Sequence, residues 1–260
     1  MRLLGQSAFV GWRIHVKNGS MTEYARPYVE PMVFRDDSGA VIEHGNHWAD
    51  RGGTPPEDSY SVVSHPERFA PLHTVATALI DHLASTYDVG VEEGHHVTLD
   101  LLHPPAADET VRAVRLTPCD DACAPVVIVL TDFPGVRVFA GVLFSAVYPS
   151  CGCNACDERW DTVADELEWE TFAIAGGGLT EEVSEPRRAK WTYDSGHGFV
   201  KGMGQTVSYR LRALDGESER SGQSRAEDVP ARMLASARAK LDAVTATSPG
   251  GNWLPWSTRR

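Results

Sequence analysis

The sequence lacks the segments that would place it in or across a membrane. None of its apolar runs approaches the roughly 18–20 residues needed to span a bilayer. The stretch from Met1 to Gly5 is a poor secretory signal, because Gln6 and Ser7 interrupt it and no small-residue cleavage site follows. These features predict a cytoplasmic protein whose thiols are reduced unless they bind a metal.

The sequence is also poor in positive charge. It has 24 lysine and arginine residues against 36 aspartate and glutamate residues, a net charge of −12. This balance argues against nucleic acid or an anionic membrane as the main partner, because both require a basic surface, and it leaves a protein partner open. The basic residues are 20 arginines and only 4 lysines, a bias typical of high-GC bacterial coding sequences.

Sequence signatures of catalysis are missing as well. There is no Gly-x-Ser-x-Gly nucleophile elbow and no His-Glu-x-x-His zinc motif. The glycine-rich segment 195–204 contains Lys201 but not the Gly-Lys-Ser/Thr ending of a phosphate loop, which favours a flexible hairpin. The sequence therefore predicts no catalytic residue and no cofactor-binding loop.

What the sequence does contain is a dense group of cysteines. Three of the five lie within six residues: Cys151, Cys153 and Cys156. Thiolates bind zinc tetrahedrally at about 2.3 Å. Gly152 and Asn154 favour a tight turn that directs three sulfurs at one ion, since both residue types tolerate left-handed backbone conformations. We predict that the three cysteines bind a metal, and zinc is the favoured ion.

A structural zinc site needs a fourth ligand, and the sequence leaves four residues open: Cys119, Cys123, Asp157 and His197. In an antiparallel meander, the 118–125 connection and the end of a strand over 136–148 lie at the same end of the sheet, so Cys119 or Cys123 is expected within reach. The alternatives to a metal are three reduced cysteines packed in a turn, or a redox or iron–sulfur role, which ranks lowest.

Two other groups of polar residues admit a functional interpretation but favour an ordinary one. Seven acidic residues occur in the helix expected over about 157–172: Asp157, Glu158, Asp161, Asp165, Glu166, Glu168 and Glu170. They could dock a basic partner, but an exposed, solvated face is favoured. His44 and His47 have ligand-like spacing, yet they lie in a loop without a third ligand, so a polar loop role is favoured.

Hydrophobic periodicity gives the expected elements. A helix begins at Pro71, with Leu72, Val75, Leu79 and Leu83 on one face. Strands are expected at four places: 97–101, 111–117, 126–130 and 136–146. Because their connections are short, they predict an antiparallel β-meander. The fold class is therefore α+β, with a sheet of about four to six strands packed by two or three helices.

The composition along the chain suggests how it is divided into a domain, a linker and terminal segments. Met21 resembles a natural start, so residues 1–20 are expected to be a non-native N-terminal extension, followed by a single α+β domain over 21–214. A Gly/Ser/Glu/Arg-rich linker is expected over 215–227. A C-terminal helix over 228–246 and a tail over 247–260 complete the chain.

Three segments of the chain resemble an uncharacterised actinobacterial family, a domain of unknown function. They are Pro66–His73, Tyr87–Val89, and Pro149–Glu158 with its motif Pro-x-Cys-Gly-Cys-x-x-Cys-Asp-Glu. The resemblance covers roughly residues 22–215 and implies no activity. It leaves residues 1–20 and the last helix as departures from the common pattern.

Two functional hypotheses follow from these features. The first is a non-enzymatic protein with a zinc-stabilised loop, which acts through protein contacts. The second is a metal-dependent enzyme in which the three cysteines leave a fourth position open for water. The first is favoured, because only Asp157 and Glu158 are acids or bases close to the cluster in sequence, and no substrate-binding motif accompanies it.

Overall fold

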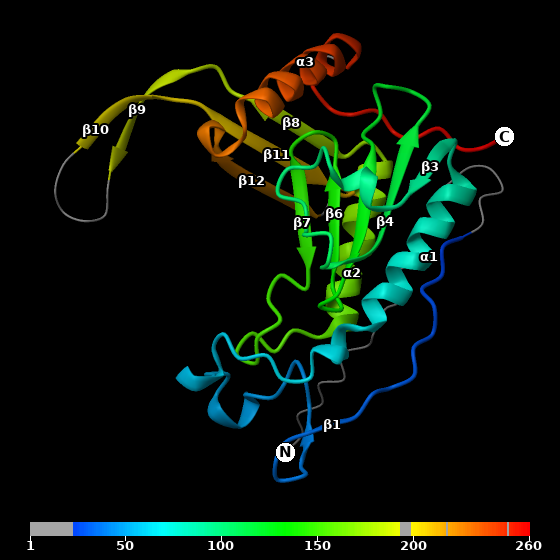
Figure 1. The fold of residues 1–260 in the computed structure, drawn as a ribbon, viewed down its shortest axis with the longest axis vertical. Coiled ribbons are helices and arrows are strands. Elements are labelled where there is room, and N and C mark those ends of the chain that lie inside the picture. The colour runs from blue at the N-terminus through cyan, green and yellow to red at the C-terminus, as the bar shows by residue number, and fades with distance from the viewer. Residues whose placement is uncertain (1–22, 193–198, 217, 249) are drawn as a thin grey trace, which may run out of the picture.

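The computed structural model describes residues 23–192, 199–216, 218–248 and 250–260. The expected N-terminal extension and His197 lie outside these residues. The described chain forms a five-stranded sheet, a three-stranded sheet, two hairpins and three α-helices (Figure 1). No helix among these residues is both long and apolar enough to cross a membrane. The predicted α+β class with an antiparallel meander is confirmed.

The five-stranded sheet is a meander in which each strand pairs antiparallel with the next along the chain. Its strands are β3 (Val89–Glu93), β4 (Thr110–Pro118), β5 (Val126–Thr131), β6 (Val136–Ala140) and β7 (Phe144–Tyr148). Central strand β5 is apolar on both faces. Its even-numbered side chains join the main core, and Val127 and Val129 join a smaller cluster on the other face.

Helices α1 (Pro71–Thr86) and α2 (Trp160–Ala175) pack against each other and cover the main-core face of the sheet. The predicted stripe of α1 is confirmed, because Leu72, Val75, Leu79 and Leu83 are all 0% exposed. Burial of each such side chain contributes about 1.5–3 kcal/mol. These contacts fix α2, and with it the loop that leads into α2.

The opposite face of the sheet is covered by a short 3₁₀ helix, η4 (His95–Thr98), where the sequence predicts a strand over 97–101. That prediction is wrong. Gly94, with φ of 129°, ends β3, and Val97 then packs into the smaller cluster while Leu99 is 68% exposed. The apolar alternation over residues 97–101 therefore belongs to a segment that packs on one face of the sheet and not to a strand within it.

The single long strand predicted over 136–146 is also wrong. The chain turns at Gly141, which has φ of 57°, and β7 returns alongside β6. A glycine is required there because an added Cβ would lie 2.1 Å from a carboxylate oxygen of Glu181. The turn reverses the chain, so the loop after β7 starts at the other end of the sheet from the 118–125 connection.

Glu181 holds this turn from a distant strand, β8 (Leu179–Val183). Its carboxylate accepts hydrogen bonds from the backbone N–H groups of Val142, Leu143 and Phe144 at 3.0, 2.6 and 2.7 Å. The indole N–H of Trp253 donates a fourth at 2.8 Å. Four donors around a side chain that is 5% exposed compensate for its desolvation.

The second sheet contains β8, β11 (Thr206–Arg212) and β12 (Glu219–Arg225), in the order β12-β11-β8. The linker predicted over 215–227 is therefore wrong for most of its length. Its polar composition suits an edge strand whose side chains face solvent, so the pattern does not reveal a strand. Helix α3 (Ala231–Thr247) packs against β8.

Two hairpins complete the described elements. The first joins β1 (Phe34–Arg35) to β2 (Val41–Ile42) through a turn over residues 36–39. Strands β9 (Arg187–Thr192) and β10 (Phe199–Gly204) pair antiparallel. In Figure 1 this second hairpin projects from the body. The dark-blue chain runs down beside α1 to β1, and the light-blue turns that follow lie below the sheet, next to the loop after β7.

The C-terminal tail is part of the core. Trp253 and Trp256 are 1% and 4% exposed. The backbone N–H groups of Trp253, Leu254 and Trp256 donate to Leu179, Ala122 and Ala175 at 3.0, 2.9 and 2.8 Å, and Ser257 accepts from Asp88 at 2.8 Å. The tail thereby joins β8, the β4–β5 connection, α2 and the end of α1.

We expect Trp253→Ala to lower the free energy of unfolding by about 3–5 kcal/mol, because it removes a buried indole and leaves Glu181 without one of its donors. Urea unfolding monitored by circular dichroism measures this loss. The control is Tyr28→Ala, since Tyr28 is 82% exposed and its removal should change stability by less than about 0.5 kcal/mol. Equal losses in both variants would contradict the role of the tail.

We expect Glu181→Gln to destabilise the protein by about 2 kcal/mol or more, because each carboxylate oxygen accepts two of the four hydrogen bonds, so the amide NH₂ would face two N–H donors. Glu182→Gln on the same strand is the matched control, since Glu182 is exposed. Thermal unfolding of both variants at one pH makes the comparison. A melting temperature for the Glu181 variant equal to that of the control would show that this carboxylate does not hold the turn.

Candidate metal centre

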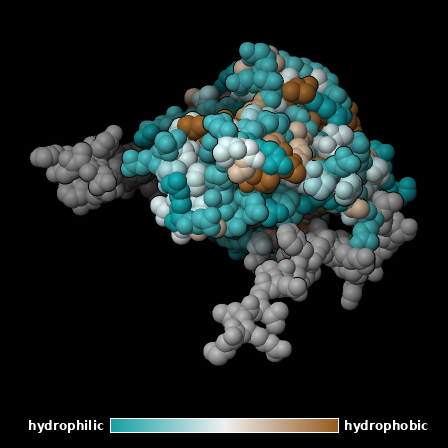
Figure 2. All heavy atoms as spheres, turned by 90° about the horizontal axis from the view of Figure 1, so that it is seen from below, coloured by the Kyte–Doolittle hydropathy of each residue, from teal (hydrophilic) through white to brown (hydrophobic). Residues whose placement is uncertain are grey.

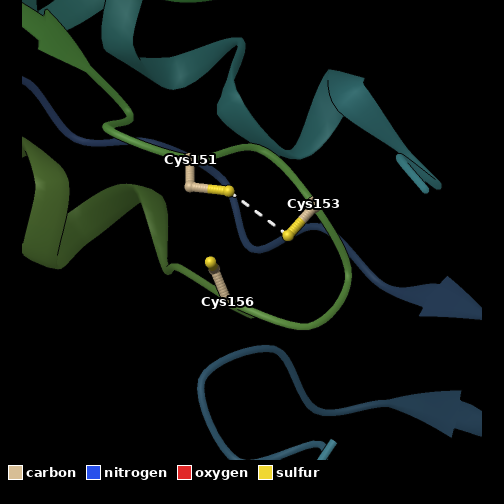
Figure 3. Close-up of side chains that lie close together, drawn as sticks. All are labelled: Cys151, Cys153 and Cys156. Carbon is tan, nitrogen blue, oxygen red and sulfur yellow. Dashed lines mark hydrogen bonds between the residues drawn. The ribbon is translucent and has the colours of Figure 1, made fainter. Parts of the chain in front are cut away.

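The three cysteines lie in the loop over residues 149–159, here called the cysteine loop, between the end of β7 and the start of α2. The sulfurs of Cys151 and Cys153 are 3.2 Å apart, and all three sulfurs lie within 4.8 Å of one another. Figure 3 shows the three side chains directed into a common space inside the loop. The structure thus brings together the three cysteines singled out in the sequence, as a group that could hold a metal ion.

The backbone of the cysteine loop does not adopt the left-handed conformation expected at Gly152 and Asn154. The positive φ is at Asp157, at 49°, and not at Gly152 or Asn154. The Asp157 N–H donates to the carbonyl of Cys153 at 3.3 Å, which closes the turn around the sulfurs. Gly152 is needed for a different reason, because an added Cβ would lie 2.5 Å from the ring of Phe133.

The thiols differ in their acidity. Hydrogen bonds from the backbone N–H of Cys156 and from the thiol of Cys151 lower the pKa of Cys153 to about 7. Hydrogen bonds to Cys151 and Cys153 favour the protonated form of Cys156 and raise the pKa of that thiol to about 12. Cys153 therefore forms a thiolate near neutral pH, and a cation among the sulfurs would favour deprotonation of Cys156.

A buried arginine adjoins the cysteine loop. Arg68 is 2% exposed, lies over the ring of Phe69, and donates to the carbonyls of Gly152 (2.9 Å) and Ser64. Burial lowers the pKa of Arg68, and the negative charges of Asp157 and Cys153 oppose that effect. Its positive charge therefore favours thiolate at Cys153.

The cysteine loop binds the N-terminal segment, defined here as residues 44–68, through Asn154. Its side-chain oxygen accepts from Ser64 N–H at 2.9 Å, and its amide donates to the Ser64 hydroxyl at 3.0 Å. Its carbonyl accepts from the indole of Trp48 at 3.0 Å, and its N–H donates to Val62 at 2.8 Å. The neighbouring Ala155 N–H donates to Ser59 at 3.1 Å.

Asp157 binds the start of the same segment. One carboxylate oxygen accepts from the N–H groups of Gly45 and His47 at 2.7 and 2.9 Å, and the other lies 3.0 Å from Nδ1 of His44. Burial lowers the pKa of His44, which favours its neutral form. His44 and His47 thus lie beside the cysteine loop, a placement that their spacing in the sequence did not indicate.

The described candidates for a fourth ligand, Cys119, Cys123 and Asp157, do not join the sulfurs, and His197 lies outside the described residues. Cys119 and Cys123 were expected within reach, which is wrong, because the turn at Gly141 places the cysteine loop at the other end of the sheet. Cys123 instead donates to the carbonyl of Pro255 at 3.3 Å. Among the described residues, no carboxylate or imidazole joins the three sulfurs within 4.8 Å.

The acidic helix is α2, and the exposed acidic face predicted for it holds only in part, at Asp165 and Glu166. Glu170 is 1% exposed and accepts from the Tyr148 hydroxyl and from Arg220. Glu168 accepts from the Tyr24 hydroxyl at 2.7 Å and pairs with Arg26. The chain's own residues therefore neutralise part of this face, which weakens its interpretation as a dock for a basic partner.

Fold and site together define an α+β protein with an antiparallel meander and a three-cysteine loop that binds the N-terminal segment. The chain belongs to the family of unknown function DUF6226, which matches residues 30–260. This match includes α3 and the tail, so the expectation that the last helix departs from the family pattern is wrong. Comparison with curated proteins and with solved structures gives no significant match.

We expect Asp157→Ala to destabilise the protein by about 1–3 kcal/mol, because three donors lose their acceptor. The amides of Gly45 and His47 should exchange with solvent faster, since they are the backbone donors to this carboxylate. Hydrogen exchange followed by mass spectrometry measures both. Asp50→Ala, at an exposed position of the same segment, is the control, and equal exchange in the two variants would contradict this role of Asp157.

Proposed function

We propose that the protein is a non-enzymatic cytoplasmic protein in which Cys151, Cys153 and Cys156 bind a structural zinc ion. The ion fixes the cysteine loop, and the loop holds the N-terminal segment in its position below the sheet. The observation that carries this proposal is the convergence of three sulfurs on the same loop that binds that segment. Thiolate ligands favour zinc over hard cations such as magnesium and calcium.

The N-terminal segment needs an external attachment because it has no apolar core of its own. Its regular structure is limited to 3₁₀ turns, η1 (Ala49–Arg51), η2 (Glu57–Ser59) and the start of η3 (Pro66–Phe69). Within residues 44–68, only Ser59 and Arg68 are buried. Its position therefore depends on hydrogen bonds to the cysteine loop, and a rigid loop strengthens them by removing the entropic cost of ordering the acceptor groups.

A protein partner is supported by the apolar side chains around this segment. Of the 13 large hydrophobic residues that are exposed in the described part of the chain, seven lie from position 28 to position 63: Tyr28, Met32, Val33, Val41, Tyr60, Val62 and Val63. Figure 2, which views the molecule from below Figure 1, shows separate apolar patches in a mainly hydrophilic surface. Apolar side chains of this kind suit a protein contact better than nucleic acid, which the net charge of −12 disfavours.

Metal analysis of the purified protein tests the proposal directly. We expect about one zinc ion per chain, its loss in Cys151→Ser, and its retention in the matched control Cys119→Ser. Chelation should lower the melting temperature and increase hydrogen exchange within residues 44–68, because the loop loses its rigidity. Metal-free protein of unchanged stability, or zinc retained by the Cys151 variant, would overturn the proposal.

A metal-dependent enzyme is the second candidate function. It is favoured by the finding that no further His, Cys, Asp or Glu side chain among the described residues lies within 4.8 Å of all three sulfurs, because catalytic zinc keeps one position open. Cobalt substitution separates the two candidates. Azide or cyanide should shift the visible spectrum of the cobalt protein if the fourth position is exchangeable, and should leave it unchanged if protein ligands close the site.

A further inference from the structure

One nitrogen of His44 has no visible role. Its Nε2 atom is buried and has no hydrogen-bond partner among the described residues, while Nδ1 lies 3.0 Å from the carboxylate of Asp157. In a neutral imidazole, a proton on Nδ1 that is donated to a carboxylate leaves Nε2 with a free lone pair. A buried acceptor without a donor is costly, so this atom calls for a binding partner.

The surroundings of His44 are those of a metal ligand. Histidines that bind metals commonly donate their second ring N–H to a carboxylate, which fixes the tautomer and the orientation of the ring. Here that carboxylate belongs to Asp157, the residue directly after Cys156. The same carboxylate holds the backbone on the far side of His44, through Gly45 and His47.

We propose that Nε2 of His44 is the fourth ligand of the metal ion held by Cys151, Cys153 and Cys156. The inference rests on the proposed zinc site and specifies it as a Cys₃His centre, one of the standard sets of structural zinc ligands. Asp157 is then a positioning residue that binds the ligand and not the ion. The site thereby joins two parts of the chain more than a hundred positions apart in sequence.

The structure also shows what metal binding requires. The nitrogens of His44 do not join the three sulfurs within 4.8 Å, whereas zinc takes nitrogen at about 2.0–2.1 Å and sulfur at about 2.3 Å. The loop must therefore close around the ion. Residues 43–47 can move with the loop, because Asp157 of that loop binds them and none of them is buried as a whole residue, and Cys156 is exposed.

X-ray absorption at the zinc edge of the unmutated protein tests this assignment without any substitution. We expect a first shell of three sulfurs and one nitrogen, with the outer-shell scattering of an imidazole ring. A shell of four sulfurs, or of three sulfurs and an oxygen without imidazole scattering, would overturn the role of His44 and leave the three-cysteine site intact. Absence of zinc would instead remove the proposed function itself.

Substitution gives an independent measurement of affinity. His44→Ala should weaken zinc binding at least tenfold in competition with a chromophoric chelator, and should change the spectrum of the cobalt protein. His47→Ala is the matched control, because His47 binds Asp157 only through its backbone N–H, and zinc affinity should not change. Equal affinities in the wild type and the His44 variant would overturn the proposal.

Discussion

The buried carboxylate of Glu181 determines where the cysteine loop lies. It accepts three successive backbone N–H groups after Gly141 and thereby separates β6 from β7. A buried carboxylate is stable only when donors surround it, and here the turn and Trp253 of the tail supply them. Without this reversal, β7 would not return along β6, and the cysteines would emerge near Cys119 and Cys123 instead of beside the N-terminal segment.

Polar contacts, and not apolar burial, join the N-terminal segment to the rest of the protein. Asn154 and Asp157 each satisfy several groups of that segment, and Arg68 of the segment binds the carbonyl of Gly152 in return. Each such hydrogen bond contributes only about 0.5–1.5 kcal/mol net, so the attachment depends on many acceptors held in fixed positions. A metal among the sulfurs would provide that rigidity where the loop has no regular structure.

Much of the fold could be predicted from the sequence, because apolar periodicity reports burial directly. The stripe of α1 and the strand β5 were both identified in this way. Predictions failed where a distant side chain decides the local structure, as Glu181 does at Gly141. They also failed where an edge strand is polar, as in β12. The cysteine group was identifiable because three cysteines lie within six residues. The position of His44 beside it was not, because Asp157 holds His44 there from more than a hundred positions away in sequence.

Metal binding at the three cysteines would be linked to attachment of the N-terminal segment in this arrangement. The loop conformation that gathers the sulfurs also positions the acceptors of Asn154 and Asp157, so each process lowers the ordering cost of the other. Linkage is reciprocal in free energy. Suppose that a partner binds the apolar side chains between positions 28 and 63 and thereby orders the segment. It must then increase the affinity for the metal by the same factor by which the metal increases the affinity for the partner.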